Sequence, residues 1–222
     1  MPTRRKPARQ AEAERNDEAL LEAARQVLAT DGAHATVAAI AARAGVGIGS
    51  LYRRYRTKEE LFQRLSTMAV EQSAEAAERG LADDDPWAGL VGFITDCVEF
   101  GQGTLGPIAG TVDVTPEMNA RAQKSDEQIA ELIARAHQAG VLRQDVTGVD
   151  ISLLIEQLGR SPVVHQLRQQ GRDDLLPAAK AARRRLITIA LDGLRPGHAT
   201  LPGPPPGPEL FTERWVRKPA TG

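Results

Sequence analysis

The sequence predicts an all-α protein with an N-terminal helix-turn-helix domain of three helices and a larger C-terminal helical domain. Apolar residues make up 41% of the 222-residue chain and are mostly alanine and leucine, which favour helix. Few stretches alternate apolar and polar residues as half-buried strands do. Residues 36–60 read as two short helices joined by a glycine turn, followed by a capped third helix.

The N-terminal residues precede the first predicted helix. Residues 1–15 are charged and lack an apolar period, so we expect a flexible basic arm. Asn16 can cap a first helix that runs to about Thr30 and stops at Asp31 and Gly32. The arm has two open interpretations, a segment that reaches DNA phosphates or the minor groove and a solubilising terminus. Its basic residues are Arg4, Arg5, Lys6 and Arg9.

The helix-turn-helix itself follows. Thr36 stands where an N-cap belongs, and Gly45 ends the first short helix where a left-handed residue is needed. One helical face carries the apolar residues Val37, Ile40 and Ala41. Residues 50–55 form the second short helix, and the second helix of such a motif fits the major groove of DNA.

The outward face of this second helix carries the candidate DNA contacts. Arg53 and Arg54 are the expected base readers, although one of them can instead bind a phosphate. Tyr52 and Lys58 are candidate phosphate contacts, against the alternative of ordinary surface residues. The full predicted DNA-binding set is Thr36, Gly47, Ile48, Gly49, Ser50, Tyr52, Arg53, Arg54 and Lys58.

This segment resembles the DNA-binding domain of TetR-family transcriptional regulators. The matching residues are Thr36-Val37, Ile40-Ala41, Ala44-Gly45-Val46, Gly49-Ser50-Leu51-Tyr52, Tyr55 and Thr57-Lys58-Glu59-Glu60-Leu61. Two positions depart from the family pattern: Gly47 replaces a frequent capping serine, and Ala39 a frequent acidic residue. The resemblance implies a homodimeric transcriptional regulator that binds an inverted-repeat operator.

The remaining helices follow from caps, apolar periods and breaks. Thr57 and Glu60 form a capping-box pattern, Pro86 suits a first helical turn, and Thr147 can cap a later helix. The expected helices cover residues 57–79, 86–100, 117–139, 147–158 and 173–194, with one short broken helix within 101–116. The predicted domains are the arm at 1–15, the helix-turn-helix at 16–62, a regulatory and dimerisation domain at 63–194, and a tail at 195–222.

The tail is rich in proline, whereas the larger domain resembles a known regulatory domain. Residues 195–222 hold seven of the 14 prolines, so we expect an extended Pro-rich segment. The order of helices from Trp87 onward, with residues 139–146 and 190–194, resembles the C-terminal domain of SbtR-like regulators.

Two functional surfaces are expected in the larger domain. An apolar effector pocket is predicted from Phe93, Cys97, Phe100, Met118, Ile129 and Ile133, with a filled core as the alternative for each of them. The resemblance implies that the last two long helices pair with those of a second copy. The candidate interface residues are Ile151, Leu154, Ile155, Leu158, Leu186, Ile187, Ala190 and Leu194.

Charge and composition limit the other classes of function. Residues 1–64 contain 12 Lys and Arg against 8 Asp and Glu, whereas the remainder contains 16 against 21, which places polyanion affinity at the N-terminal end. Cys97 is the single cysteine, and we expect a buried apolar filler rather than a redox sensor. The four histidines match no ligand spacing, so no metal or cofactor is expected. No apolar run approaches the roughly 18 residues of a membrane span, and a cytoplasmic location is expected.

Together these observations predict a sequence-specific DNA-binding regulator, a repressor released by a small apolar or amphipathic effector. The alternative is an effector-independent regulator controlled by a protein partner or by its own abundance. A third hypothesis, an enzyme of unrelated class, has no catalytic constellation in its favour.

Overall fold

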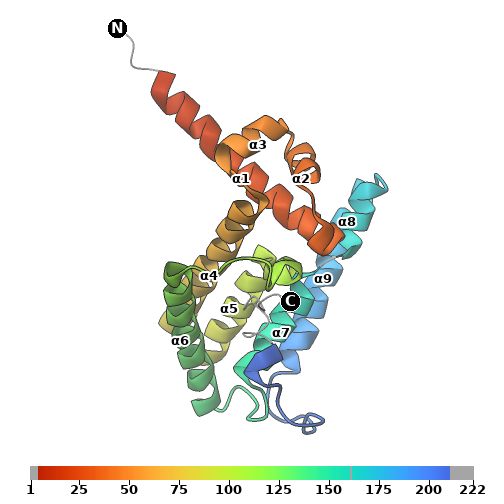
Figure 1. Ribbon diagram of the computed structural model, residues 1–222. Helices are drawn as coiled ribbons and strands as arrows, with labels where there is room; N and C mark the ends of the chain where they lie inside the picture. The colour runs from red at the N-terminus through yellow and green to blue at the C-terminus, as the bar shows by residue number, and fades with distance from the viewer. Residues whose placement is uncertain (1–4, 161, 211–222) are drawn as a thin grey trace, which may run out of the picture.

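The computed structural model describes residues 5–160 and 162–210, which form helices and loops without a strand (Figure 1). The α-helices are α1 (Arg5–Asp31), α2 (Val37–Ala44), α3 (Ile48–Arg54), α4 (Lys58–Ala82), α5 (Pro86–Phe100), α6 (Pro116–Gln138), α7 (Gly148–Gly159), α8 (Pro162–Gln169) and α9 (Leu176–Asp192). Short 3-10 helices occupy η1 (Gly32–His34), η2 (Gln102–Ile108), η3 (Asp173–Leu175) and η4 (Pro208–Leu210). The all-α prediction is confirmed.

The N-terminal head is built from α1, α2, α3 and the first turns of α4. One apolar cluster holds these helices together and extends to η2, which lies beneath the head. Its fully buried members include Leu28, Ile40, Leu51, Leu61 and Leu65. The head therefore shares its core with one segment of the body.

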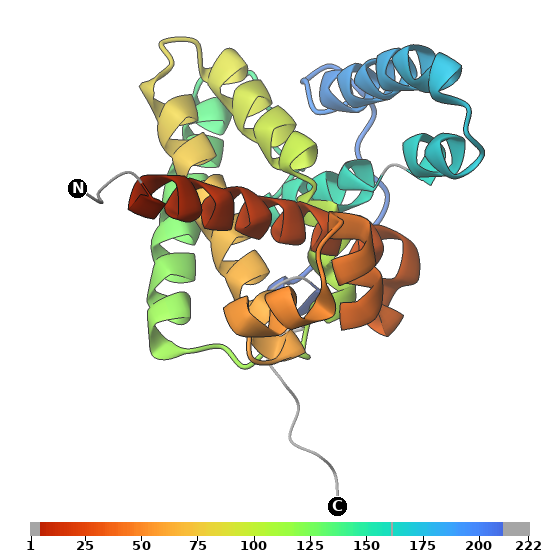
Figure 2. The same cartoon turned by 90° about the horizontal axis from the view of Figure 1, so that it is seen from above.

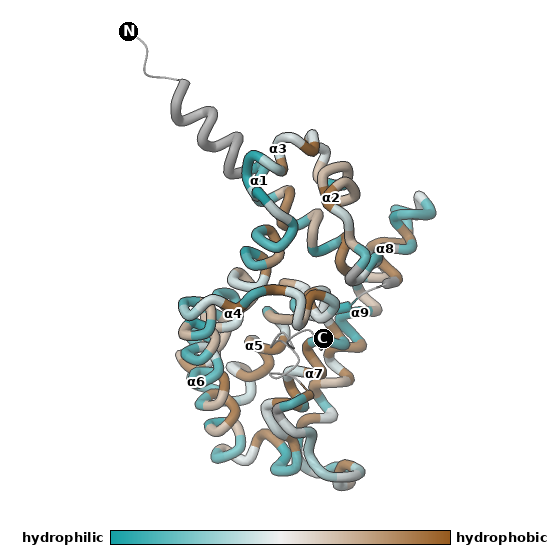
Figure 3. The backbone as a smooth tube through the Cα atoms, in the orientation of Figure 1, coloured by the Kyte–Doolittle hydropathy of each residue, from teal (hydrophilic) through white to brown (hydrophobic). Residues whose placement is uncertain are grey.

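The body is a bundle of α4, α5, α6 and α7 around a second apolar cluster. Helix α4 runs from the head into this bundle, so it joins the two domains (Figure 1). Apolar residues gather on the inner sides of the bundle helices, and hydrophilic residues line the outer side of α6 (Figure 3). In Figure 2 the cyan and blue α8–α9 pair lies at the edge of the body.

Local capping explains where several helices begin and end. The Thr36 hydroxyl accepts a hydrogen bond of 3.1 Å from the Ala39 amide, and Gly45 closes α2 with φ +69°. Thr147 and Asp150 form a reciprocal capping box at α7. At α4 only half of the expected box is present, because the Glu60 carboxylate accepts from the Arg56 amide rather than from that of the N-cap Thr57.

The prediction of a flexible arm at residues 1–15 needs correction for residues 5–15. Helix α1 begins at Arg5, so residues 5–15 continue the first helix instead of preceding it. This stretch is rich in Ala, Glu, Arg and Gln, which are strong helix formers, and Pro7 falls in the first turn where its missing N–H is tolerated. Arg4 lies outside the described residues, and the side chains of Arg5, Lys6 and Arg9 are also outside that description.

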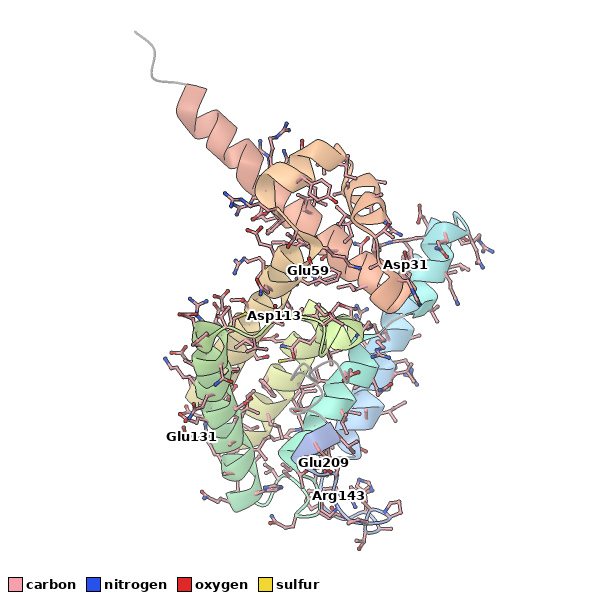
Figure 4. All side chains as sticks on the ribbon, in the orientation of Figure 1. Asp31, Glu59, Asp113, Glu131, Arg143 and Glu209 are labelled. Carbon is pink, nitrogen blue, oxygen red and sulfur yellow. The ribbon has the colours of Figure 1, made fainter. Side chains whose placement is uncertain are left out.

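The start of the tail is attached to the body. The Arg143 guanidinium binds the Asp145 carboxylate and donates to the Ala199 carbonyl, and the Leu201 amide donates to Asp145 at 2.9 Å. Figure 4 labels Arg143 at this end of the molecule. Residues 195–210 contain no α-helix, as expected for the proline content, and the rest of the predicted tail, 211–222, lies outside the described residues.

Candidate nucleic-acid interface

Helix α3 lies at the far end of the head from the body (Figure 1). Only one side of it is buried, through Leu51 and the adjoining Tyr55. Ile48 is 49% exposed and Tyr52 is 48% exposed, which is unusual for large apolar and aromatic side chains. An exposed helical face of this composition suits contact with base edges and sugar in a major groove.

Arg53 lies on the same exposed face. Its Nη2 donates to the Ser50 hydroxyl at 2.7 Å, one turn earlier on α3. An arginine has five N–H donors, so this bond leaves several free for a guanine edge or a phosphate. The structure thus presents the Arg53 guanidinium outward and holds it in position.

Arg54 binds a carboxylate of the head itself, although it was predicted to read a base. Its Nε and Nη2 bind both oxygens of Asp17 on α1 at 2.8 and 2.9 Å, and the Tyr55 hydroxyl donates to the same carboxylate at 2.6 Å. The Arg54 hydrogen bond holds the pKa of Asp17 below its ordinary value, and burial raises the pKa of Tyr55. Arg54 therefore fastens the recognition helix to α1, and its prediction as a base reader is not supported.

The two glycines near the start of α3 leave open space around the backbone. A Cβ atom added at Gly47 or Gly49 would meet nothing within 4 Å. Gly47 is the N-cap of α3 and supplies no side-chain cap, as its departure from the family pattern suggests. The backbone here is accessible to a partner.

Lys58 is half-buried at the first residue of α4. Its Nζ lies 5.2 Å from the centre of the Phe62 ring. A cation in a first helical turn opposes the helix macrodipole, so a phosphate nearby would improve its environment. Its role as a phosphate contact stays a prediction.

Comparison with known proteins adds to this geometry. The family model described as bacterial regulatory proteins, tetR family, matches residues 20–65. A second model, the C-terminal domain of SbtR-like transcriptional regulators, matches residues 85–196, which is half of the chain. The chain belongs to the TetR family.

Individual TetR relatives agree. The HTH-type transcriptional repressor LfrR of Mycolicibacterium smegmatis is 35% identical over 129 residues, which cover 55% of this chain and 66% of that protein. A TetR regulator from Streptomyces coelicolor is 23% identical over 82% of this chain and 99% of its own, with a TM-score of 0.50. One from Marinobacter aquaeolei VT8 is 23% identical over 84% and 98%, with a TM-score of 0.52. The two structures show the fold alone.

Membership fixes the broad function. TetR regulators are non-enzymatic proteins that bind DNA, regulate transcription and act as dimers, so the enzyme hypothesis is wrong. Within the described ranges no three His, Cys, Asp or Glu residues group as a metal site. None of the described helices is long and apolar enough to cross a bilayer.

The residues predicted for a TetR effector pocket do not come together. Phe93, Cys97 and Ile133 are buried within the packed body core, where burial raises the pKa of the Cys97 thiol to about 12. Met118 instead packs against the head core, because α6 begins beside η2 and the head. Ile129 is half-buried beside the body core.

Phe100 borders an open space. It lines a cleft of about 610 Å³ between α1, the end of α5 and the α8–α9 pair. The sequence analysis missed this cleft, although the basic run at 183–185 was a visible signal for it. Its lining residues are Glu22, Arg25, Gln26, Ala29, Glu99, Phe100, Gly101, Thr104, Gly159, Val164, Arg168, Lys180, Arg183, Arg184 and Ile187.

The predicted dimer residues divide into two groups. Ile151, Ile155, Ile187 and Leu194 point into the protomer's own core, so their prediction as interface residues is not supported. Leu154, Leu158 and Ala190 are half-buried. Leu186 is 60% exposed, and Ile189, which the sequence analysis missed, is 64% exposed.

The exposed residues form one stripe on α9. Ala178, Ala182, Leu186 and Ile189 recur at intervals of three or four residues, so they share a helical face opposite Ile187. An exposed apolar stripe of this kind is a candidate interaction surface.

Proposed function

We propose that this TetR regulator is a repressor that binds an inverted-repeat operator as a homodimer. The observation that carries this proposal is the exposed face of α3, where Ile48, Tyr52 and Arg53 project from a helix fixed by its Arg54 bond to α1. The related LfrR is named a repressor, which supports the sign of regulation.

The α9 stripe supports the dimer. Two copies that join Leu186 and Ile189 across a two-fold axis would remove these side chains from water and complete the apolar face. The two α3 helices would then address half-sites spaced by about one DNA turn, roughly 34–36 Å. Operator symmetry follows from protein symmetry.

A small effector that is apolar or amphipathic would release the repressor. It acts only through a difference in its affinity for the DNA-bound and the free dimer. The filled core around Phe93, Cys97 and Ile133 favours the alternative, an effector-independent regulator controlled by a partner or by abundance. The cleft beside Phe100 favours an effector, in a different place from the one expected.

The test is selection of bound duplexes from a random pool, followed by footprinting on the selected sites. We expect an enriched inverted repeat protected on one face of the DNA. The matched control is an Ile48→Ala, Tyr52→Ala double variant, which should fold and fail to enrich that repeat. Enrichment of single half-sites, or of no motif, would contradict the proposal.

A further inference from the structure

Two arginines that line the cleft beside Phe100 each have one buried guanidinium nitrogen without an acceptor. Among the described residues, Arg25 Nη1 and Arg183 Nε are buried and make no hydrogen bond. Both side chains line this cleft, one from α1 and one from α9. Buried donors without acceptors are costly and rare, so two in one cleft point to a missing acceptor.

Arg183 is held in place by backbone carbonyls and not by a close ion pair. Its Nη2 donates to the carbonyls of Val98 at 3.0 Å and Leu158 at 3.3 Å, which ties α9 to α5 and α7. No carboxylate of the described residues lies within ion-pair distance of it, and desolvation lowers the pKa of its guanidinium, an effect that the Glu99 carboxylate of the same cleft offsets only in part. A half-buried cation in such a position is stabilised by an anion.

Arg25 forms the opposite side of the cleft. Its Nε and Nη2 bind Glu22 at 3.2 and 2.6 Å, and its guanidinium lies 4.5 Å from the centre of the Phe100 ring. The Glu22 carboxylate also accepts from Gln26 at 2.8 Å. Glu22, one of the two acidic residues in the cleft, is therefore already engaged by Arg25 and Gln26.

The lining of the cleft has a net positive charge and is partly apolar. Five of its residues are cationic and two are acidic. Arg168, Lys180 and Arg184 form no ion pair with any described residue. Phe100, Val164 and Ile187 supply the apolar part of the wall.

We propose that this cleft binds an amphipathic carboxylate, with its anionic head between Arg183 and Arg25 and its apolar part against Phe100 and Ile187. This inference rests on the proposed function, because it names the effector's site and chemical class. A carboxylate has two acceptor oxygens and can satisfy both free guanidinium donors.

The location also gives a route to the DNA-binding face. Arg25 is on α1, the same helix whose Asp17 holds Arg54 and thereby α3. Arg183 is on α9, the helix with the exposed apolar stripe. A ligand that bridges α1 and α9 links the recognition helix to the dimerisation helix, which is the differential contact that an effector requires.

The experiment is calorimetric titration of the full chain, without DNA, with three probes of equal chain length: decanoate, decanol and decyltrimethylammonium. We expect decanoate to bind and each of the other two to bind at least about tenfold more weakly, since a charge-assisted hydrogen bond is lost. Equal affinity for decanoate and decanol would overturn the anion site.

Variants locate the binding. Arg183→Gln should weaken decanoate by about tenfold or more. Because Arg183 also holds α9, a Lys180→Gln, Arg184→Gln double variant provides a second test that leaves those carbonyl bonds intact, and it should weaken decanoate severalfold. Arg185→Gln, an exposed position of α9 outside the cleft, is the matched control and should bind as the parent protein does. Equal losses in Arg185→Gln and in the cleft variants would place the site elsewhere.

A separate operator-binding assay distinguishes this inference from the proposed function. Decanoate that binds through Arg183 without changing operator affinity supports the site and contradicts its role as effector site. Release of the operator by decanoate that is unchanged in Arg183→Gln and in the double variant supports an effector mechanism and overturns this cleft.

Discussion

Two adjacent arginines of α3 point in different directions and make different contacts. Arg53 faces outward beside Ser50, whereas Arg54 binds Asp17. Arg53→Ala should therefore cost about 1–3 kcal/mol of binding on the selected operator and much less on random DNA, if Arg53 reads a base. Fluorescence anisotropy at fixed salt measures both losses. Equal losses on the two DNAs would show that Arg53 contacts only phosphate.

The Asp17 carboxylate gives the head a defined acid sensitivity. Its pKa is lowered from 3.8 by Arg54, so its contribution to stability is complete above about pH 4 and is lost as pH falls through the lower folded value. Asp17→Asn removes the charge and should destabilise the protein by about 1–2 kcal/mol at pH 7. In urea unfolding the difference between parent and variant should shrink below pH 4. A difference that grows toward acid would contradict this assignment.

At the scale of elements, local chemistry explains what the sequence could predict. The caps at Thr36, Thr147 and Gly45 act within one helical turn, so they are readable without the fold. The side on which α9 is buried depends on what packs against it, and its apolar residues cover both sides. The sequence therefore did not separate exposed Leu186 from buried Ile187.

This separation leads to a test of the dimer. Leu186→Asp or Ile189→Asp places a charge on the exposed α9 stripe, where it leaves the protomer core intact and costs several kcal/mol in an apolar interface. Sedimentation should show folded monomers. Ile187→Asp is the contrasting control, since Ile187 is buried within one protomer and its replacement should unfold the chain. Intact dimers in both stripe variants would place the interface elsewhere.

At the scale of the molecule, contacts between residues far apart in sequence determine where a pocket can form. The effector pocket was predicted from apolar residues of α5 and α6, but Phe93, Cys97 and Ile133 fill the body core. The observed cleft combines Arg25 of α1 with Arg183 of α9, a pairing that no local pattern reveals. Charged residues dispersed along the chain read as a solvated surface until the fold brings them together.

The close packing of α4 on α5 within the body depends on two glycines. A Cβ at Gly80 would lie 2.7 Å from the Gly89 carbonyl oxygen, and a Cβ at Gly89 would meet the Gly80 carbonyl more closely still. Gly89→Ala should therefore destabilise the protein by about 1–3 kcal/mol, since overpacking against backbone outweighs the gain in helix propensity.

Gly92, on the same helix, is the matched control. A Cβ there meets nothing within 4 Å, so Gly92→Ala should be neutral or stabilise by up to about 1 kcal/mol through helix propensity alone. Thermal unfolding of the two variants beside the parent separates packing from propensity. If both alanines raise the melting temperature, α4 and α5 do not meet at these glycines.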